Sequence, residues 1–187
     1  MLITLLILLA AAPSGAFDVV YFHLYTFKLY RRPQSRREEV THLVRGTLFP
    51  LGLGLLLYGR PEGAWFWFVV ALFAIELVNS LIDITLEPNS RAPQRVPGVE
   101  LVIHSLGATM MGAAAVSYLI LEWAAGMQPT QLRPHPPGVL PAWLPPAGQL
   151  TVAIATGILL LEAVLFLRHR SKWPPARVAE YTGIRSR

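Results

Sequence analysis

The segment from Ala64 to Leu86 reads AWFWFVVALFAIELVNSLIDITL, and it decides the class of protein to which this chain belongs. About 20 predominantly apolar residues are enough for a helix to cross the hydrocarbon core of a bilayer, and this segment is long enough. It opens on the aromatic run at 65–68, and Trp in particular favours the membrane–water interface. We therefore predict a transmembrane helix, in which the two carboxylates, Glu76 and Asp83, need an explanation of their own.

Apolar blocks of similar length lie on both sides of this segment. They predict an all-α, multi-pass transmembrane bundle of about five helices, at residues 2–29, 38–59, 64–86, 99–123 and 150–167. Composition agrees, because 14% of the residues are charged whereas a soluble domain has about 25%. The mean hydropathy is +0.46. The chain has no cysteine, which excludes disulfides, thiolate metal sites, iron–sulfur clusters and cysteine nucleophiles.

We expect a single membrane domain at residues 1–172, followed by a short cytoplasmic tail at 173–187. A proline-rich external loop is expected at 126–149, because proline lacks an amide donor and clashes with the preceding helical turn. Residues 1–16 allow a second interpretation, a cleaved signal peptide. We favour a retained first helix, because no basic residue precedes the apolar run and the apolar character resumes after Gly15.

Basic residues are distributed unequally between the two sides of the predicted bundle. Six flank the first connection, two lie in the third, and six follow the last helix, whereas the opposite side has only Arg60 and Arg133. Cytoplasmic loops carry the excess of Lys and Arg. We therefore predict an inner (cytoplasmic) membrane protein with its N-terminus outside and its C-terminus in the cytoplasm. The net charge of +5 then reflects topology, and no nucleic-acid partner is expected.

Several ionisable residues lie inside the predicted helices, where each charge costs about 2.5–3.5 kcal/mol on insertion scales and usually serves a function. Counted from the basic flanks at about 1.5 Å per residue, His23, Asp83 and His104 lie about 12–14 Å deep. His42 is somewhat shallower. Ligand-type side chains from four helices are therefore expected in one layer of the cytoplasmic half.

The spacing of these residues places them on common helix faces. Glu39 and His42 are three residues apart, Glu100 and His104 are four apart, and both spacings bring side chains together. A stripe on the third helix contains Glu76, Asn79 and Asp83.

Asp18 and Arg45 need separate interpretations. Asp18 and His23 are five residues apart, which is a turn of about 140° in an α-helix. We therefore expect His23 to be the ligand and Asp18 a supporting or proton-relay group, unless Gly15 distorts the helix. Arg45 lies at membrane depth and needs an anionic partner. Glu162, a carboxylate of the cluster, and an anionic headgroup or substrate carboxylate are the alternatives.

A dinuclear metal site accounts for this constellation. The predicted ligands are His23, Glu39, His42, Glu76, Asp83, Glu100 and His104, and the supporting groups are Asp18, Arg45, Asn79 and Glu162. Four ionised carboxylates carry a charge that two divalent ions would cancel. Carboxylate and imidazole ligands suit iron, which we expect, with manganese or zinc as alternatives.

The ligand pattern resembles the di-metal carboxylate sites of ferritin-like di-iron proteins, in which four helices supply glutamates and Glu-x-x-His pairs. Glu39 and His42 match that motif, and Glu100 and His104 differ from it by one residue. The resemblance concerns the ligand pattern and not the whole chain. It implies a di-iron oxidoreductase, which in a membrane would act on a lipid-soluble substrate.

Other function classes remain open at this stage. One is a zinc-dependent membrane hydrolase, and another is a non-enzymatic subunit that binds metal or haem or has a structural role in a membrane complex. The expected partners are membrane lipid, a lipid-soluble small molecule, and a partner subunit or second copy of the chain. His135 and His169 are expected to lie outside the site.

Overall fold

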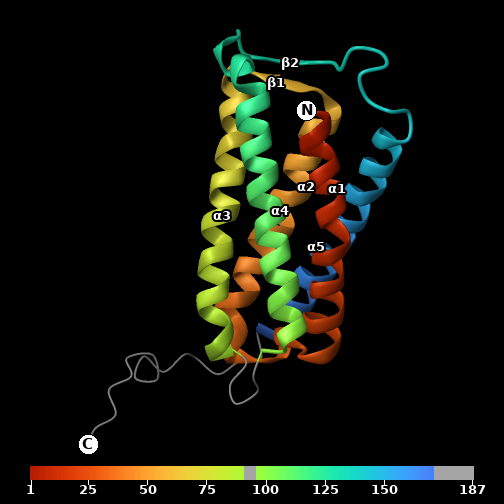
Figure 1. The fold of residues 1–187 in the computed structure, drawn as a ribbon. Coiled ribbons are helices and arrows are strands. Elements are labelled where there is room, and N and C mark those ends of the chain that lie inside the picture. The colour runs from red at the N-terminus through yellow and green to blue at the C-terminus, as the bar shows by residue number, and fades with distance from the viewer. Residues whose placement is uncertain (91–95, 171–187) are drawn as a thin grey trace, which may run out of the picture.

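The structure, a computed structural model, describes residues 1–90 and 96–170 and contains five long helices (Figure 1). Helix α1 (Leu2–Phe17) continues into the π-helix η1 (Asp18–Thr26). Each long helix, with α1 and η1 taken together, is long and apolar enough to cross a membrane. The prediction of an all-α bundle with five membrane-length helices is confirmed. The four long helices that follow η1 are α2 (Arg36–Tyr58), α3 (Ala64–Ser90), α4 (Gly98–Glu122) and α5 (Leu144–Arg170).

The helices pack as one bundle in which α1 lies against α4, and α2 lies against both α3 and α5. Small residues bring α2 and α5 close together, as is common between membrane helices. A Cβ atom at Gly46 would lie 3.0 Å from a methyl carbon of Leu159. The apolar core occupies the upper half of the bundle in Figure 1, where the rings of Phe66 and Tyr118 stack at 5.1 Å. Glu62 and Glu122 are buried at the upper end, whereas the other buried acidic side chains lie lower in the bundle.

Two short strands close the upper end. Strand β1 (Arg60–Glu62) pairs antiparallel with β2 (Gln131–Arg133), and Arg60 lies opposite Arg133. Arg60 Nε donates a hydrogen bond to Glu122 at 2.7 Å. The two basic residues predicted for the outer side are thus neighbours at this end. Short 3-10 helices complete the described elements: η2 (Leu29–Arg31), η3 (Pro33–Ser35) and η4 (Trp123–Met127).

Two predicted helix boundaries are wrong: the end of the first helix and the start of the last. The first helical run stops at Thr26, before the predicted residue 29, because Lys28 adopts a left-handed conformation with φ of 51°. Helix α5 begins at Leu144, six residues earlier than predicted, with Pro145 and Pro146 in its first turn. Proline is tolerated there because the amides of a first turn have no partner within the helix. The predicted tail at 173–187 lies outside the described residues.

Candidate metal centre

Buried polar side chains gather in the half of the bundle where α2 begins, which is the lower half in Figure 1. We call the eight acidic side chains given at the end of this paragraph, together with His23, His42 and His104, the polar cluster. Since a buried charge is costly unless it is paired, hydrogen-bonded or bound to a metal, the question is what neutralises them. Eight acidic residues of the cluster are buried: Asp18, Glu38, Glu39, Glu76, Asp83, Glu87, Glu100 and Glu162.

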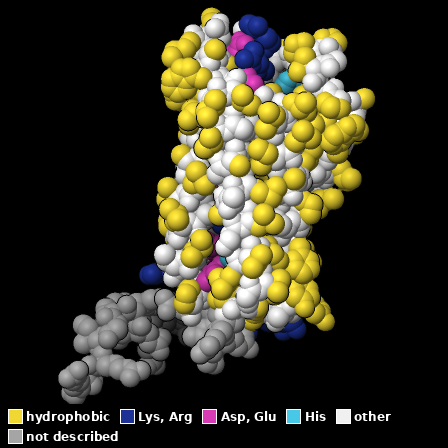
Figure 2. Space-filling view, viewed as in Figure 1, with side chains coloured by type: hydrophobic (Ala, Val, Ile, Leu, Met, Phe, Trp, Pro, Cys, Tyr) yellow, Lys and Arg dark blue, Asp and Glu magenta, His cyan; other side chains and the backbone are white. Residues whose placement is uncertain are grey.

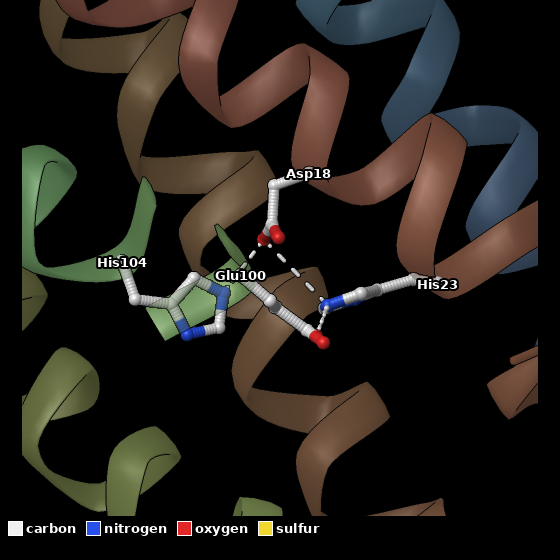
Figure 3. A group of neighbouring side chains, drawn as sticks. All are labelled: Asp18, His23, Glu100 and His104. Atoms are coloured by element: carbon white, nitrogen blue, oxygen red, sulfur yellow. Dashed lines mark hydrogen bonds and ion pairs between the residues drawn. The ribbon is translucent and has the colours of Figure 1, made fainter. Parts of the chain in front are cut away.

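Four side chains of the cluster form what we call the first ligand group: Asp18, His23, Glu100 and His104. One donor atom from each lies within 4.8 Å of the others. The four side chains point toward one another from η1 and α4 (Figure 3). His104 Nε2 lies 2.8 Å from Asp18 Oδ2, and His23 Nε2 lies 3.5 Å from Glu100 Oε1. The group offers two imidazoles and two carboxylates to one ion.

A second ligand group adjoins the first and contains His23, Glu38 and His42, whose donor atoms also lie within 4.8 Å of one another. The rings of His23 and His42 are 4.0 Å apart between centroids. Nδ1 of His42 is buried and has no hydrogen-bond partner among the described residues. Because His23 belongs to both groups, two ions bound here would be neighbours.

The π-helix explains why Asp18 joins the first group. We expected Asp18 to face away from His23 because five residues turn about 140° in an α-helix. In a π-helix, however, hydrogen bonds join residues five apart, so residues at that spacing lie nearly above one another. His23 Nε2 is 3.6 Å from Asp18 Oδ2. The predicted assignment of Asp18 to another face was therefore wrong.

In α2 the structure brings Glu38, rather than the predicted Glu39, into a ligand group. Glu38 is not among the ligands that the sequence predicts. Glu39 is also buried but belongs to neither group. Glu38 and His42 are four residues apart, the same spacing as Glu100 and His104, so one Glu-x-x-x-His pattern occurs on two helices. That shared spacing is the sequence signal that would have selected Glu38.

Helix α3 contributes carboxylates that face the histidines from outside the groups. Asp83 Oδ1 lies 3.3 Å from His42 Nε2, and Glu87 Oε1 contacts His104 Nδ1. Each of these histidines therefore turns one nitrogen to α3 and has the other for its ligand group, which is the usual arrangement of metal-binding histidines. Asp83 was predicted as a direct ligand, whereas Glu87, four residues further along the same stripe, was not selected.

Arg45 contributes a cation to the cluster, and two predicted ligands pair with it. Its Nε lies 2.8 Å from Glu76 Oε1, its NH1 lies 3.2 Å from Asp83 Oδ2, and its NH2 donates to Ser80 Oγ at 3.0 Å. A cluster carboxylate is thus the partner of Arg45, as one of the alternatives predicted. The contacts of Glu76 and Asp83 place both outside the two ligand groups. Glu162 is buried on α5 and forms no ion pair with Arg45 within the described part.

The remaining predicted residues have structural contacts. Asn79 Nδ2 donates to the backbone carbonyl of Thr41 at 2.9 Å, which fixes α3 against α2. His135 Nε2 lies 2.8 Å from a backbone carbonyl of α2 near the strands. His169 Nδ1 lies 2.9 Å from the carbonyl of Leu165. Neither of these two histidines belongs to a ligand group.

A cavity of about 410 Å³ begins at the polar cluster and extends toward the middle of the bundle. Asp18, His42 and His104 line its polar end, so the cavity touches both ligand groups. Glu162 lines it from α5. A molecule in this cavity would lie beside ions bound in the groups.

Comparison with protein-family models, with curated proteins and with solved structures gives no match for this chain. The resemblance to ferritin-like di-iron sites therefore rests on the ligand pattern alone. The donor atoms, the charges and the cavity are the features of this chain that bear on its function.

Proposed function

We propose that this chain is a membrane metalloprotein that holds two divalent cations side by side, one in each ligand group. The observation that carries the proposal is the sharing of His23 by two sets of donor atoms, each set within 4.8 Å. Two-metal catalytic sites have ions about 3.5–4 Å apart, which requires adjoining ligand sets of this kind.

The charge of the cluster supports bound cations. Asp18 and Glu100 face the first group and Glu38 faces the second, and all three are buried. The guanidinium of Arg45 is engaged by Glu76 and Asp83 on α3. Buried ions are tolerated when they are paired with opposite charge, and a divalent cation in each group would supply it.

The donor set favours iron among the divalent metals. It combines imidazole nitrogen with carboxylate oxygen, and the chain has no thiolate to offer. Such mixed ligands suit iron, with manganese and zinc as the alternatives. The carboxylates of Asp83 and Glu87 would orient His42 and His104 toward their ions.

We further propose that the centre is a di-iron oxidoreductase that acts on a lipid-soluble substrate. The cavity supports an enzyme over a purely structural metal site, because it gives a small molecule access to both ligand groups. When bound, the iron pair would supply the redox chemistry with dioxygen. The chain supplies the ligands, the fixed Arg45 and a water-poor space for the substrate.

Elemental analysis and visible absorption of the detergent-purified protein test this proposal. We expect about two equivalents of iron per chain, one for each ligand group, and no haem absorption band. Zinc at the same stoichiometry would preserve the site and favour a hydrolase. Purified protein that binds none of these metals, even after incubation with ferrous, manganous or zinc salts, would contradict the proposal.

A further inference from the structure

The cavity is elongated along the bundle axis. Its lining runs from Asp18 back to Leu9 on α1, and from Glu162 back to Thr151 on α5. At about 1.5 Å per residue, these intervals correspond to about 14 and 17 Å. With a volume of about 410 Å³, the cavity has the size of sites that hold small organic ligands.

The two ends of the cavity differ in chemistry. The end away from the polar cluster is lined by apolar side chains, among them Leu9, Phe49 and Met111. The near end is lined by Arg45, Ser80 and the carboxylates of the cluster. This gradient matches a molecule with an apolar chain and a polar head, oriented with its head toward the ligand groups.

The head group decides which amphiphile fits. Lipid tails are as apolar as the far wall, so placing a tail in the cavity provides little preference over the bilayer. Arg45 is the one guanidinium among the described residues that line the cavity, and Glu76 and Asp83 already engage it. In the protein without metal, an anionic head would therefore meet carboxylates beside a guanidinium that already has two carboxylate partners. An uncharged hydroxyl or carbonyl could hydrogen-bond to Ser80 or to Arg45, whose side chain is 26% exposed.

The cavity is accessible from the side of the bundle. Ile154 of α5 and Ile84 of α3 line it, and their side chains are 51% and 45% exposed, so the cavity is not closed off from the surroundings. Figure 2 shows acidic and histidine atoms visible among apolar atoms in the lower half of the molecule. A molecule dissolved in the bilayer could reach the cavity without leaving the membrane.

We propose that the cavity binds a single-chain membrane amphiphile with an uncharged hydroxyl or carbonyl head, whose head lies at Arg45 and Ser80 and whose chain extends toward Leu9. Such an amphiphile would be the substrate of the metal centre. That role rests on the proposed function, whereas binding does not. The binding itself depends on the cavity and can be measured separately from metal.

Photolabelling tests the proposal directly. The probe is dodecanol with a diazirine near the end of its chain, added to the protein in phosphatidylcholine nanodiscs and mapped by mass spectrometry. We expect crosslinks on the far wall, at Leu9, Phe49 or Met111, and several-fold less labelling in the presence of excess dodecanol. In metal-free protein, excess dodecanoate should compete much less. Equal competition by dodecanoate would overturn the assignment of an uncharged head.

A pair of glycine variants provides the matched control. A Cβ atom at Gly107, which lines the cavity, or at Gly112 would meet no atom within 4 Å. The two positions are on α4 but five residues apart, a turn of about 140°, so they face different directions. Gly107→Leu should abolish far-wall labelling by filling the cavity, and Gly112→Leu should retain it. Ala155→Phe, which fills the cavity from α5, replaces Gly107→Leu if that variant does not fold.

The outcomes separate this inference from the proposed function. Labelling confined to outward-facing side chains, or unchanged by both Gly107→Leu and Ala155→Phe, would overturn the ligand assignment. Metal is measured in the same nanodiscs. Metal-containing protein without far-wall labelling would contradict only the ligand class, whereas far-wall labelling of a protein that binds no metal would contradict only the metal centre.

Discussion

His104 of α4 lies with its Nε2 atom 2.8 Å from Oδ2 of Asp18, a residue 86 positions earlier in the chain. The contact links the two helical segments that build the first ligand group, and it depends on the π-helical turn that carries Asp18. Because the other nitrogen of His104 faces Glu87, Nε2 is the atom that would bind a metal. We predict that a bound ion replaces the direct contact between these two side chains.

The two ligand groups predict a graded loss of metal in three alanine variants. His104 belongs only to the first group, His42 only to the second, and His23 to both. His104→Ala and His42→Ala should each lower the bound metal by roughly half, because each variant leaves one ligand group of a two-metal site intact. His23→Ala should lower it by more than either. Elemental analysis of protein purified in parallel measures the difference.

His135→Ala is the control for that series. His135 lies near the strands and contacts a backbone carbonyl of α2, so its replacement should leave the metal content at the wild-type level. Equal losses in all four variants would indicate general instability instead of two ligand groups.

Glu38 and Glu39 give a comparison between neighbouring positions. Both side chains are buried in the first turn of α2, but only Glu38 belongs to a ligand group. Glu38→Gln should reduce metal binding at the second group, because an amide is a much poorer ligand for a divalent ion than a carboxylate. Glu39→Gln should retain metal. The reverse order, measured by metal titration, would restore the Glu-x-x-His interpretation and contradict the structure.

Removal of Arg45 should destabilise the bundle strongly. Arg45→Ala leaves Glu76 and Asp83 without their cation, and breaking a buried ion pair from one side costs about 3–5 kcal/mol. Arg45→Lys should be milder because it retains the charge. Thermal unfolding in detergent measures the effect. The additional change Asp83→Asn should recover part of the lost stability, and an Arg45→Ala protein as stable as wild type would show that the pairing contributes little.

The orientation of the bundle is testable with reporters. A reporter that is active only in the cytoplasm should be active when fused to the C-terminus. It should be silent when inserted at Gly138, between β2 and α5, because Arg60 and Arg133 are the only basic residues described near that end. An active reporter at Gly138 would invert the predicted topology.

The sequence predicts the helices well because bilayer thickness sets a length that apolar runs must meet. Boundaries are less predictable because they depend on single residues. The positive φ of Lys28 ends the first helical run. The prolines at 145 and 146 led us to predict a loop there, but they lie in the first turn of α5, where proline is tolerated. These are local backbone choices that periodicity does not encode.

The candidate site is partly predictable for a related reason. Depth and helical spacing select His23, His42, Glu100 and His104, which the structure brings into ligand groups. The same reasoning assumes regular α-helix, so it places Asp18 on the wrong face because it does not anticipate a π-helix. It also cannot decide which carboxylates turn toward Arg45, since that depends on how α3 packs against α2.

X-ray absorption at the iron edge of the iron-loaded protein in nanodiscs tests whether two metal ions lie side by side. We predict a first shell of nitrogen and oxygen ligands and a second iron at about 3.5–4 Å, the separation of two-metal sites. His42→Ala should abolish the iron–iron scattering while it preserves the first shell of the remaining ion. Wild-type protein that contains iron without any iron–iron scattering would contradict the dinuclear centre.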